Sequence, residues 1–133
     1  MEYTYASLAD RIKAAIIDGL VIIAAMFAIS EVFSWFQTIP NIARILAFIS
    51  VFIGYDPIMT STYGATVGHT FSNISVKRDK DRTKNLAFHS ALLRFILKSS
   101  LGWISLLTVT GNTKRKAIHD LAVSSVVLKT NTL

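Results

Sequence analysis

The sequence predicts an all-α membrane protein with two transmembrane helices, a third membrane-associated or re-entrant helical segment and a small cytoplasmic β pair. Three observations predict this class. Two long apolar runs, at about residues 12–33 and 42–60, reach the ~17–25 residues that a bilayer requires. A third apolar run, at about residues 90–110, carries a polar stripe. Two β-branched stretches flank this third run. We expect residues 1–133 to form a single domain.

The composition is typical of a membrane protein. Hydrophobic residues make up 52% of the chain and charged residues 17%, whereas soluble domains carry about 25% charged residues. The chain has no cysteine, which excludes disulfides, thiolate catalysis and cysteine-ligated metal sites. The net charge is +6. We assign it to basic loops that lie against anionic headgroups on the cytoplasmic side, and not to nucleic-acid binding.

The first helix is predicted from about Ser7 to about Phe33. Ser7 and Asp10 have the spacing of a capping box, with Asp in place of Glu. No strongly basic segment precedes the apolar run, and the run is too long for a signal peptide, so we expect a retained anchor. Small residues recur every fourth position, a spacing that allows close helix packing in lipid; the alternative is that alanine is simply common in helices. These residues are Ala15 and Gly19, and Ala24 and Ala28.

The second span is predicted from about Ile42 to about Met59, with Tyr55-Asp56-Pro57 marking its end. Residues 61–70 are polar and rich in Gly, Ser and Thr, which predicts a helix end and a turn. Ile74-Ser75-Val76 predicts a short strand, and the β-branched run at 123–129 is its expected partner.

The third apolar run is not expected to cross the bilayer. Ser90, Arg94 and Lys98 fall at i, i+4 and i+8 and form one polar stripe. Basic clusters lie on both sides, at 77–84 and 114–116, and a single crossing would place one of them outside, against the positive-inside rule. We therefore expect two crossings, cytoplasmic termini and a re-entrant or interfacial helix; three crossings is the alternative. The helix is expected to break near Gly102 and Gly111.

One acidic residue, Asp18, lies inside the first span, where a carboxylate costs at least ~2.5–3.5 kcal/mol. Arg11 precedes it by two helical turns on the same face, about 10 Å away. Asp18 is predicted to be a fixed counter-ion of Arg11, Arg94 or Lys98. The alternative is a carboxylate that exchanges a proton for a cation. The predicted charge cluster and ion site therefore comprises Arg11, Asp18, Arg94, Lys98 and Asp120.

Five motifs occur in a familiar order. The first motif is Ala6-Ser7-Leu8-Ala9-Asp10-Arg11 together with Asp18, and the second is Gly64-Ala65-Thr66-Val67-Gly68. The third is Ile74-Ser75-Val76 and the fourth is Arg94. The fifth is Lys114-Arg115-Lys116-Ala117-Ile118-His119-Asp120-Leu121-Ala122 together with Val126-Val127. Together they resemble the RDD family of small bacterial membrane proteins, which is named for one Arg and two Asp. The resemblance implies that Arg11, Asp18 and Asp120 are these residues. His69 and Thr70 stand where relatives usually place Lys, so a contact made by that Lys is not carried over.

We expect no enzyme activity, no catalytic residue and no cofactor. His119 and Asp120 are adjacent, which does not place them as a catalytic dyad, and no nucleophile or metal-ligand spacing is present. The resemblance implies a protein of the bacterial inner membrane, and antiport has been proposed for some relatives. The predicted function is an accessory or assembly subunit of a homo-oligomer or larger membrane complex. The alternative is an oligomeric sodium/proton antiporter that uses Asp18.

Overall fold

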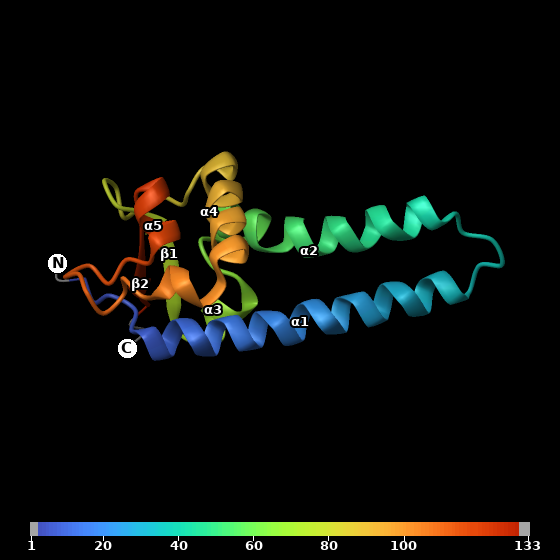
Figure 1. Cartoon of the computed structure of the whole chain (residues 1–133), viewed down its shortest axis with the longest axis horizontal. Coiled ribbons are helices and arrows are strands. Elements are labelled where there is room, and N and C mark those ends of the chain that lie inside the picture. Colours follow the sequence, from blue (N-terminus) through green and yellow to red (C-terminus); the bar gives the residue numbers. More distant parts are fainter. Residues whose placement is uncertain (1–2, 131–133) are drawn as a thin grey trace.

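Residues 3–130 are described by a computed structural model. Two long helices, α1 (Leu8–Ser34) and α2 (Asn41–Tyr63), form an antiparallel hairpin (Figure 1). At 1.5 Å per residue they are about 40 and 35 Å long, which exceeds the ~30 Å hydrocarbon core of a bilayer. Both helices are long and apolar enough to cross a membrane. The structure thus contains the two candidate membrane-spanning helices that the sequence predicts.

The remaining elements gather at the end of the hairpin where α1 begins and α2 ends (Figure 1). We call this part, residues 3–7 and 64–130, the head. Its elements are α3 (Val67–Phe71), β1 (Ile74–Arg78), α4 (Phe88–Leu101), the 3₁₀ helix η1 (Gly102–Leu106), α5 (Ile118–Val123) and β2 (Ser125–Lys129).

The predicted strand pair is confirmed. β1 and β2 are antiparallel, with Val76 opposite Val127. The other side of β2 is bonded to the segment before α1, since the Ala6 N–H donates to the Val127 carbonyl oxygen at 2.9 Å. The small sheet therefore fixes the start of α1 against the head. Its apolar side chains belong to a small core comprising Ala6, Ala14, Ile74, Val76, Leu86, Ala91 and Val127.

The predicted capping box at the start of α1 is also confirmed. The Asp10 N–H donates to Ser7 Oγ at 3.2 Å, and the Ser7 N–H donates to Asp10 Oδ2 at 2.9 Å. These two bonds satisfy N–H groups that a helix start leaves without partners.

The expected end of α2 at Tyr55-Asp56-Pro57 is wrong. The helix continues through Pro57 to Tyr63 and ends at Gly64, whose φ of +74° lies in the left-handed region. Its polar last turns are satisfied internally, because Thr62 Oγ1 donates to the Ile58 carbonyl oxygen at 2.5 Å. The segment after Gly64, predicted as a turn, contains the five-residue helix α3.

The third apolar run forms α4 and η1, and the helix breaks at Gly102 as predicted, where φ is +54°. With 14 residues, α4 is about 21 Å long, which is too short to cross the hydrocarbon core. It lies across the base of the hairpin (Figure 1). This placement does not support the alternative of three crossings.

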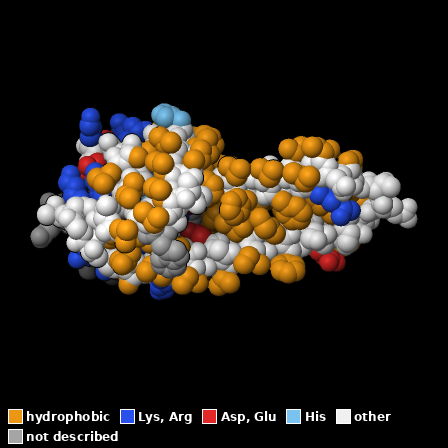
Figure 2. All heavy atoms as spheres, in the orientation of Figure 1, with side chains coloured by type: hydrophobic (Ala, Val, Ile, Leu, Met, Phe, Trp, Pro, Cys, Tyr) orange, Lys and Arg blue, Asp and Glu red, His pale blue; other side chains and the backbone are white. Residues whose placement is uncertain are grey.

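Charged side chains are concentrated at one end of the molecule. Figure 2 shows hydrophobic side chains over the hairpin and also over part of the head, whereas Lys and Arg gather mainly on the head. The hairpin helices leave large apolar side chains more than half exposed, including Leu20, Phe27 and Ile42. Within α1 and α2, the residues that are buried lie toward the head. The outer part of the hairpin therefore presents its apolar surface to lipid or to other helices.

Candidate functional site

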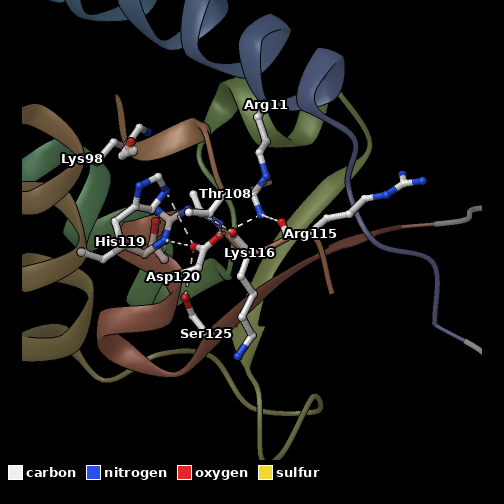
Figure 3. Close-up of polar contacts among 12 residues, drawn as sticks. Arg11, Lys98, Thr108, Arg115, Lys116, His119, Asp120 and Ser125 are labelled. Atoms are coloured by element: carbon white, nitrogen blue, oxygen red, sulfur yellow. Dashed lines mark hydrogen bonds and ion pairs between the residues drawn. The ribbon is translucent and has the colours of Figure 1, made fainter. Parts of the chain in front are cut away.

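An ion pair joins the first turn of α1 to the start of α5. Arg11 Nη2 lies 2.7 Å from Asp120 Oδ2, and the two side chains are 6% and 0% exposed (Figure 3). The same nitrogen donates to the carbonyl oxygen of Arg115 at 2.7 Å. Arg11 and Asp120 are thus bonded directly to each other although they lie 109 positions apart in the sequence. Both are residues that the family resemblance identifies.

Arg94 of α4 extends this ion pair. Its Nε–H donates to Asp120 Oδ1 at 3.0 Å, and its Nη1 lies 3.9 Å from Asp56 Oδ1. Asp56, near the end of α2, is also 3.1 Å from Lys98 Nζ through its other oxygen. We call Arg11, Asp120, Arg94, Asp56 and Lys98 the charge network. It connects α1, α5, α4 and α2 through alternating charges.

The Asp120 carboxylate also receives neutral donors. The Ala117 N–H donates to Oδ2 at 3.1 Å and Ser125 Oγ donates to Oδ1 at 3.2 Å. Burial alone would raise the pKa of Asp120, but the cations of Arg11 and Arg94 outweigh this effect and hold the pKa well below its usual range. Asp120 is therefore an ionised carboxylate, and its four partners fix the position of α5.

Asp18 is not part of the charge network, and the prediction that it pairs with a cation is wrong. Its carboxylate accepts hydrogen bonds from Tyr55 Oη (2.8 Å), Thr66 Oγ1 (2.6 Å) and the Gly68 N–H (2.8 Å). No ion pair found within residues 3–130 includes Asp18. The buried Asp18 carboxylate instead accepts its hydrogen bonds from neutral donors in α2 and at the start of α3, which satisfy its oxygens without a cation.

Gly68 is required for this arrangement. A Cβ atom at this position would overlap the carbonyl oxygen of Ala14 and would lie 2.7 Å from the Asp18 carboxylate. Only a glycine lets the backbone of α3 approach α1 this closely. The Gly-x-Thr-x-Gly segment thus provides two donors to Asp18, the Thr66 hydroxyl and the Gly68 N–H, and the space that the carboxylate needs.

Of the five predicted cluster residues, the structure brings four into the charge network and leaves Asp18 outside it. It adds Asp56, which sequence reasoning used only as a helix-end signal. The missing signal was the helical spacing of Asp56 and Thr60, which places a carboxylate and a hydroxyl on one face, and Thr60 Oγ1 does donate to Asp56 Oδ1 at 3.1 Å. Tyr55 and Thr66, the two hydroxyl donors to Asp18, were also missed.

Two histidines lie against the charge network and are held neutral. Burial, with the nearby cations Arg94 and Lys98, lowers the pKa of both His119 and His69 to about 3. His119 Nε2 is 3.7 Å from Asp120 Oδ1, which is longer than a hydrogen bond. His69 Nδ1 accepts a bond from the Thr66 N–H at 3.2 Å, which is consistent with a neutral ring.

Acidification is expected to destabilise the fold through these histidines. In the unfolded chain these histidines are protonated near pH 6.5, whereas in the folded chain they are protonated only near pH 3. Their contribution to the free energy of unfolding is therefore fully present above pH 6.5 and is lost as the pH falls from 6.5 toward 3. The test is the free energy of unfolding in detergent between about pH 7 and pH 5. The slope is expected to become shallower in His119→Gln. The slope should not change in His89→Gln, because His89 is exposed. Equal slopes in the unmodified protein, His119→Gln and His89→Gln would contradict this expectation.

The arrangement is one of fixed charges. Each of Asp18, Asp56 and Asp120 is engaged by two or more donors or cations. Within the described part of the chain, no group of three or more His, Cys, Asp or Glu side chains is placed to hold a metal ion. The geometry therefore suits the rigid attachment of the head to the hairpin.

Comparison with protein-family models identifies a family. The family model described as RDD family matches residues 5–124, which is most of the chain. No curated protein and no solved structure matches. The matched region includes every residue of the charge network and the whole Asp18 environment.

Proposed function

The chain belongs to the RDD family, and on this basis we propose that it is an accessory or assembly subunit of the bacterial inner membrane, acting in a homo-oligomer or a larger membrane complex. The observation that supports this proposal is the division of the molecule into two parts. The head is closed by a charge network in which every cation meets a carboxylate. The hairpin, in contrast, leaves its apolar side chains uncovered and free to pack against other membrane helices.

The charge distribution supports an orientation with the head in the cytoplasm. The basic clusters at 77–84 and 114–116 belong to the head, whereas the outer half of the hairpin carries Arg44 and Glu31. The positive-inside rule favours the head on the cytoplasmic side. Both termini would then be cytoplasmic, and α4 would lie along the membrane surface.

The small residues of α1 provide a specific contact surface for this assembly. A Cβ atom at Gly19 would meet nothing within 4 Å, so this glycine faces away from the rest of the chain. Ala15 and Gly19 lie on one face of the helix. Ala28 lies nine residues after Gly19, about half a turn round, and so on the opposite face. A close helix contact at the first pair is sensitive to added bulk at Gly19, but not at Ala28.

We expect the detergent-extracted protein to have a native mass above that of one chain. Gly19→Leu should reduce this mass, because the larger side chain separates helices that approach at glycine, and Ala28→Leu is the matched control. The measurement is native mass spectrometry of protein extracted from membranes at low expression level. A monomer free of other proteins under all mild extraction conditions would contradict the assembly role.

The alternative of sodium/proton antiport has less support. Asp18 already accepts three hydrogen bonds, from donors that would have to be displaced by a cation. Two helices also cannot enclose a pathway by themselves. The same preparation distinguishes the two roles, since vesicles that contain only this chain should show no sodium-dependent pH change. A sodium-dependent signal that is lost in Asp18→Asn would overturn the assembly proposal in favour of antiport.

A further inference from the structure

A cavity of about 330 Å³ lies between α1 and the head, beside the charge network. Its walls come from five elements, α1, α3, α4, η1 and β2, and from His119 at the start of α5. This volume is within the range of small-molecule binding sites. The proposed assembly role depends on the exposed hairpin and shares only Ala15 with the lining of this cavity.

The polar part of the cavity is cationic. Arg11, Arg94 and Lys98 line it, and its lining contains no acidic residue. Figure 3 shows Arg11 reaching down from α1 toward Asp120, with His119 and Lys98 on the left of the view. The network itself holds three cations against two carboxylates, Asp56 and Asp120, so it carries a net positive charge although each cation meets a carboxylate. An anion in the cavity would balance it.

Three of the lining side chains have donors or acceptors that the protein does not satisfy. Arg11 Nε, Arg94 Nη1 and His119 Nδ1 are buried and have no hydrogen-bond partner within the described structure. The three residues are 7%, 2% and 1% exposed. Unsatisfied nitrogens in a buried site are costly, and a ligand with several acceptor oxygens offers them partners. Lys98, with three N–H donors, has some left after bonding Asp56.

Apart from His69 and Ser105, the rest of the lining is apolar. Ile12, Ala15 and Ile16 of α1 form one side, and Leu106 of η1 another. Ile16 is 60% exposed and continues into the apolar surface of the hairpin. A ligand that fits both parts has a compact anionic group and an apolar chain that leaves along α1.

We propose that this cavity binds the phosphate of an anionic membrane phospholipid, with an acyl chain lying along Ile12 and Ile16. Phosphate oxygens accept hydrogen bonds from guanidinium and ammonium groups, which is the chemistry that the cavity offers. The site lies at the first turns of a membrane-spanning helix, where the headgroup of a lipid resides. The inference rests on the membrane placement of the hairpin and is independent of whether the chain assembles.

The test is native mass spectrometry of the full chain in a non-ionic detergent, titrated with phosphatidylglycerol or with phosphatidylcholine. We expect one phosphatidylglycerol to be retained per chain and phosphatidylcholine to be retained much less. Lys98→Gln removes a charge-assisted hydrogen bond and should weaken retention about tenfold. Lys13→Gln is the matched control, because Lys13 is an exposed lysine near the same membrane surface but outside the cavity.

A second pair of variants does not alter the charge network. Leu106→Trp should fill part of the cavity and reduce lipid retention, whereas Leu107→Trp, at a neighbouring residue that is 72% exposed, should not. Equal retention of the two lipids, or an equal loss in Lys98→Gln and Lys13→Gln, would overturn the proposal. Displacement of the lipid by millimolar inorganic phosphate, with no effect of Leu106→Trp, would also overturn it and assign the site to a soluble phosphate.

Discussion

Replacing Asp120 by alanine is expected to lower the free energy of unfolding by about 3–5 kcal/mol, the cost of breaking a buried ion pair from one side. The change leaves two buried guanidinium groups, those of Arg11 and Arg94, without their carboxylate. It also removes the acceptor for the Ala117 N–H at the start of α5. The measurement is denaturant-induced unfolding of the purified protein in detergent, followed by circular dichroism.

Asp81→Ala is the matched control for this prediction. Asp81 pairs with Lys84 at 3.7 Å, but both side chains are exposed, at 43% and 66%. Exposed ion pairs contribute little because water and salt screen them. Asp81 also accepts two exposed hydrogen bonds from Thr83, and we therefore expect a much smaller loss in Asp81→Ala than in Asp120→Ala. A similar loss of stability in both variants would show that the effect does not come from burial of the charge network.

Gly68→Ala is expected to be the second most damaging change, with a loss of about 1–3 kcal/mol or more, as for other overpacked sites. The added methyl group would overlap the Ala14 carbonyl oxygen, which is backbone and cannot rotate away. It would also push against the Asp18 carboxylate and disturb its bond from the Gly68 N–H. Thermal unfolding of the detergent-solubilised variant measures this loss.

Gly19→Ala controls for the substitution itself and should have the opposite sign. Gly19 lies in the interior of α1, and a Cβ atom there meets nothing within 4 Å. Alanine is favoured over glycine in a helix by roughly 0.8–1 kcal/mol, so the monomer should become slightly more stable. If Gly68→Ala were tolerated as well as Gly19→Ala, α3 would not pack against α1 at Gly68 as described.

Much of the fold could be predicted because its signals are local. Apolar runs of sufficient length predicted both long helices, the Ser7–Asp10 spacing predicted the start of α1, and β-branched stretches predicted the strands. The end of α2 was mispredicted because proline normally disrupts a helix. The helix nevertheless continues through Pro57 to Tyr63, and hydroxyl groups of its last turns, such as that of Thr62, bond to its own carbonyl groups.

The partners of the buried charges could be predicted only in part. Periodicity placed Arg11 and Asp18 on one face, and this suggested that they share a site. Which atoms reach them depends on tertiary packing. Asp18 is met by Thr66 and Gly68, about 50 positions later, through a close approach that no helical spacing shows. Arg11 meets Asp120 because the sheet returns the end of the chain to the start of α1.

The ion pair between Arg11 and Asp120 attaches the head to the hairpin. A double-mutant cycle with Arg11→Met and Asp120→Leu tests it most directly, with the free energy of unfolding in detergent as the readout. Arg11→Met should cost about 3 kcal/mol or more in the native sequence and at least about 2 kcal/mol less when Asp120 is already leucine. An equal cost of Arg11→Met in both backgrounds would contradict the account.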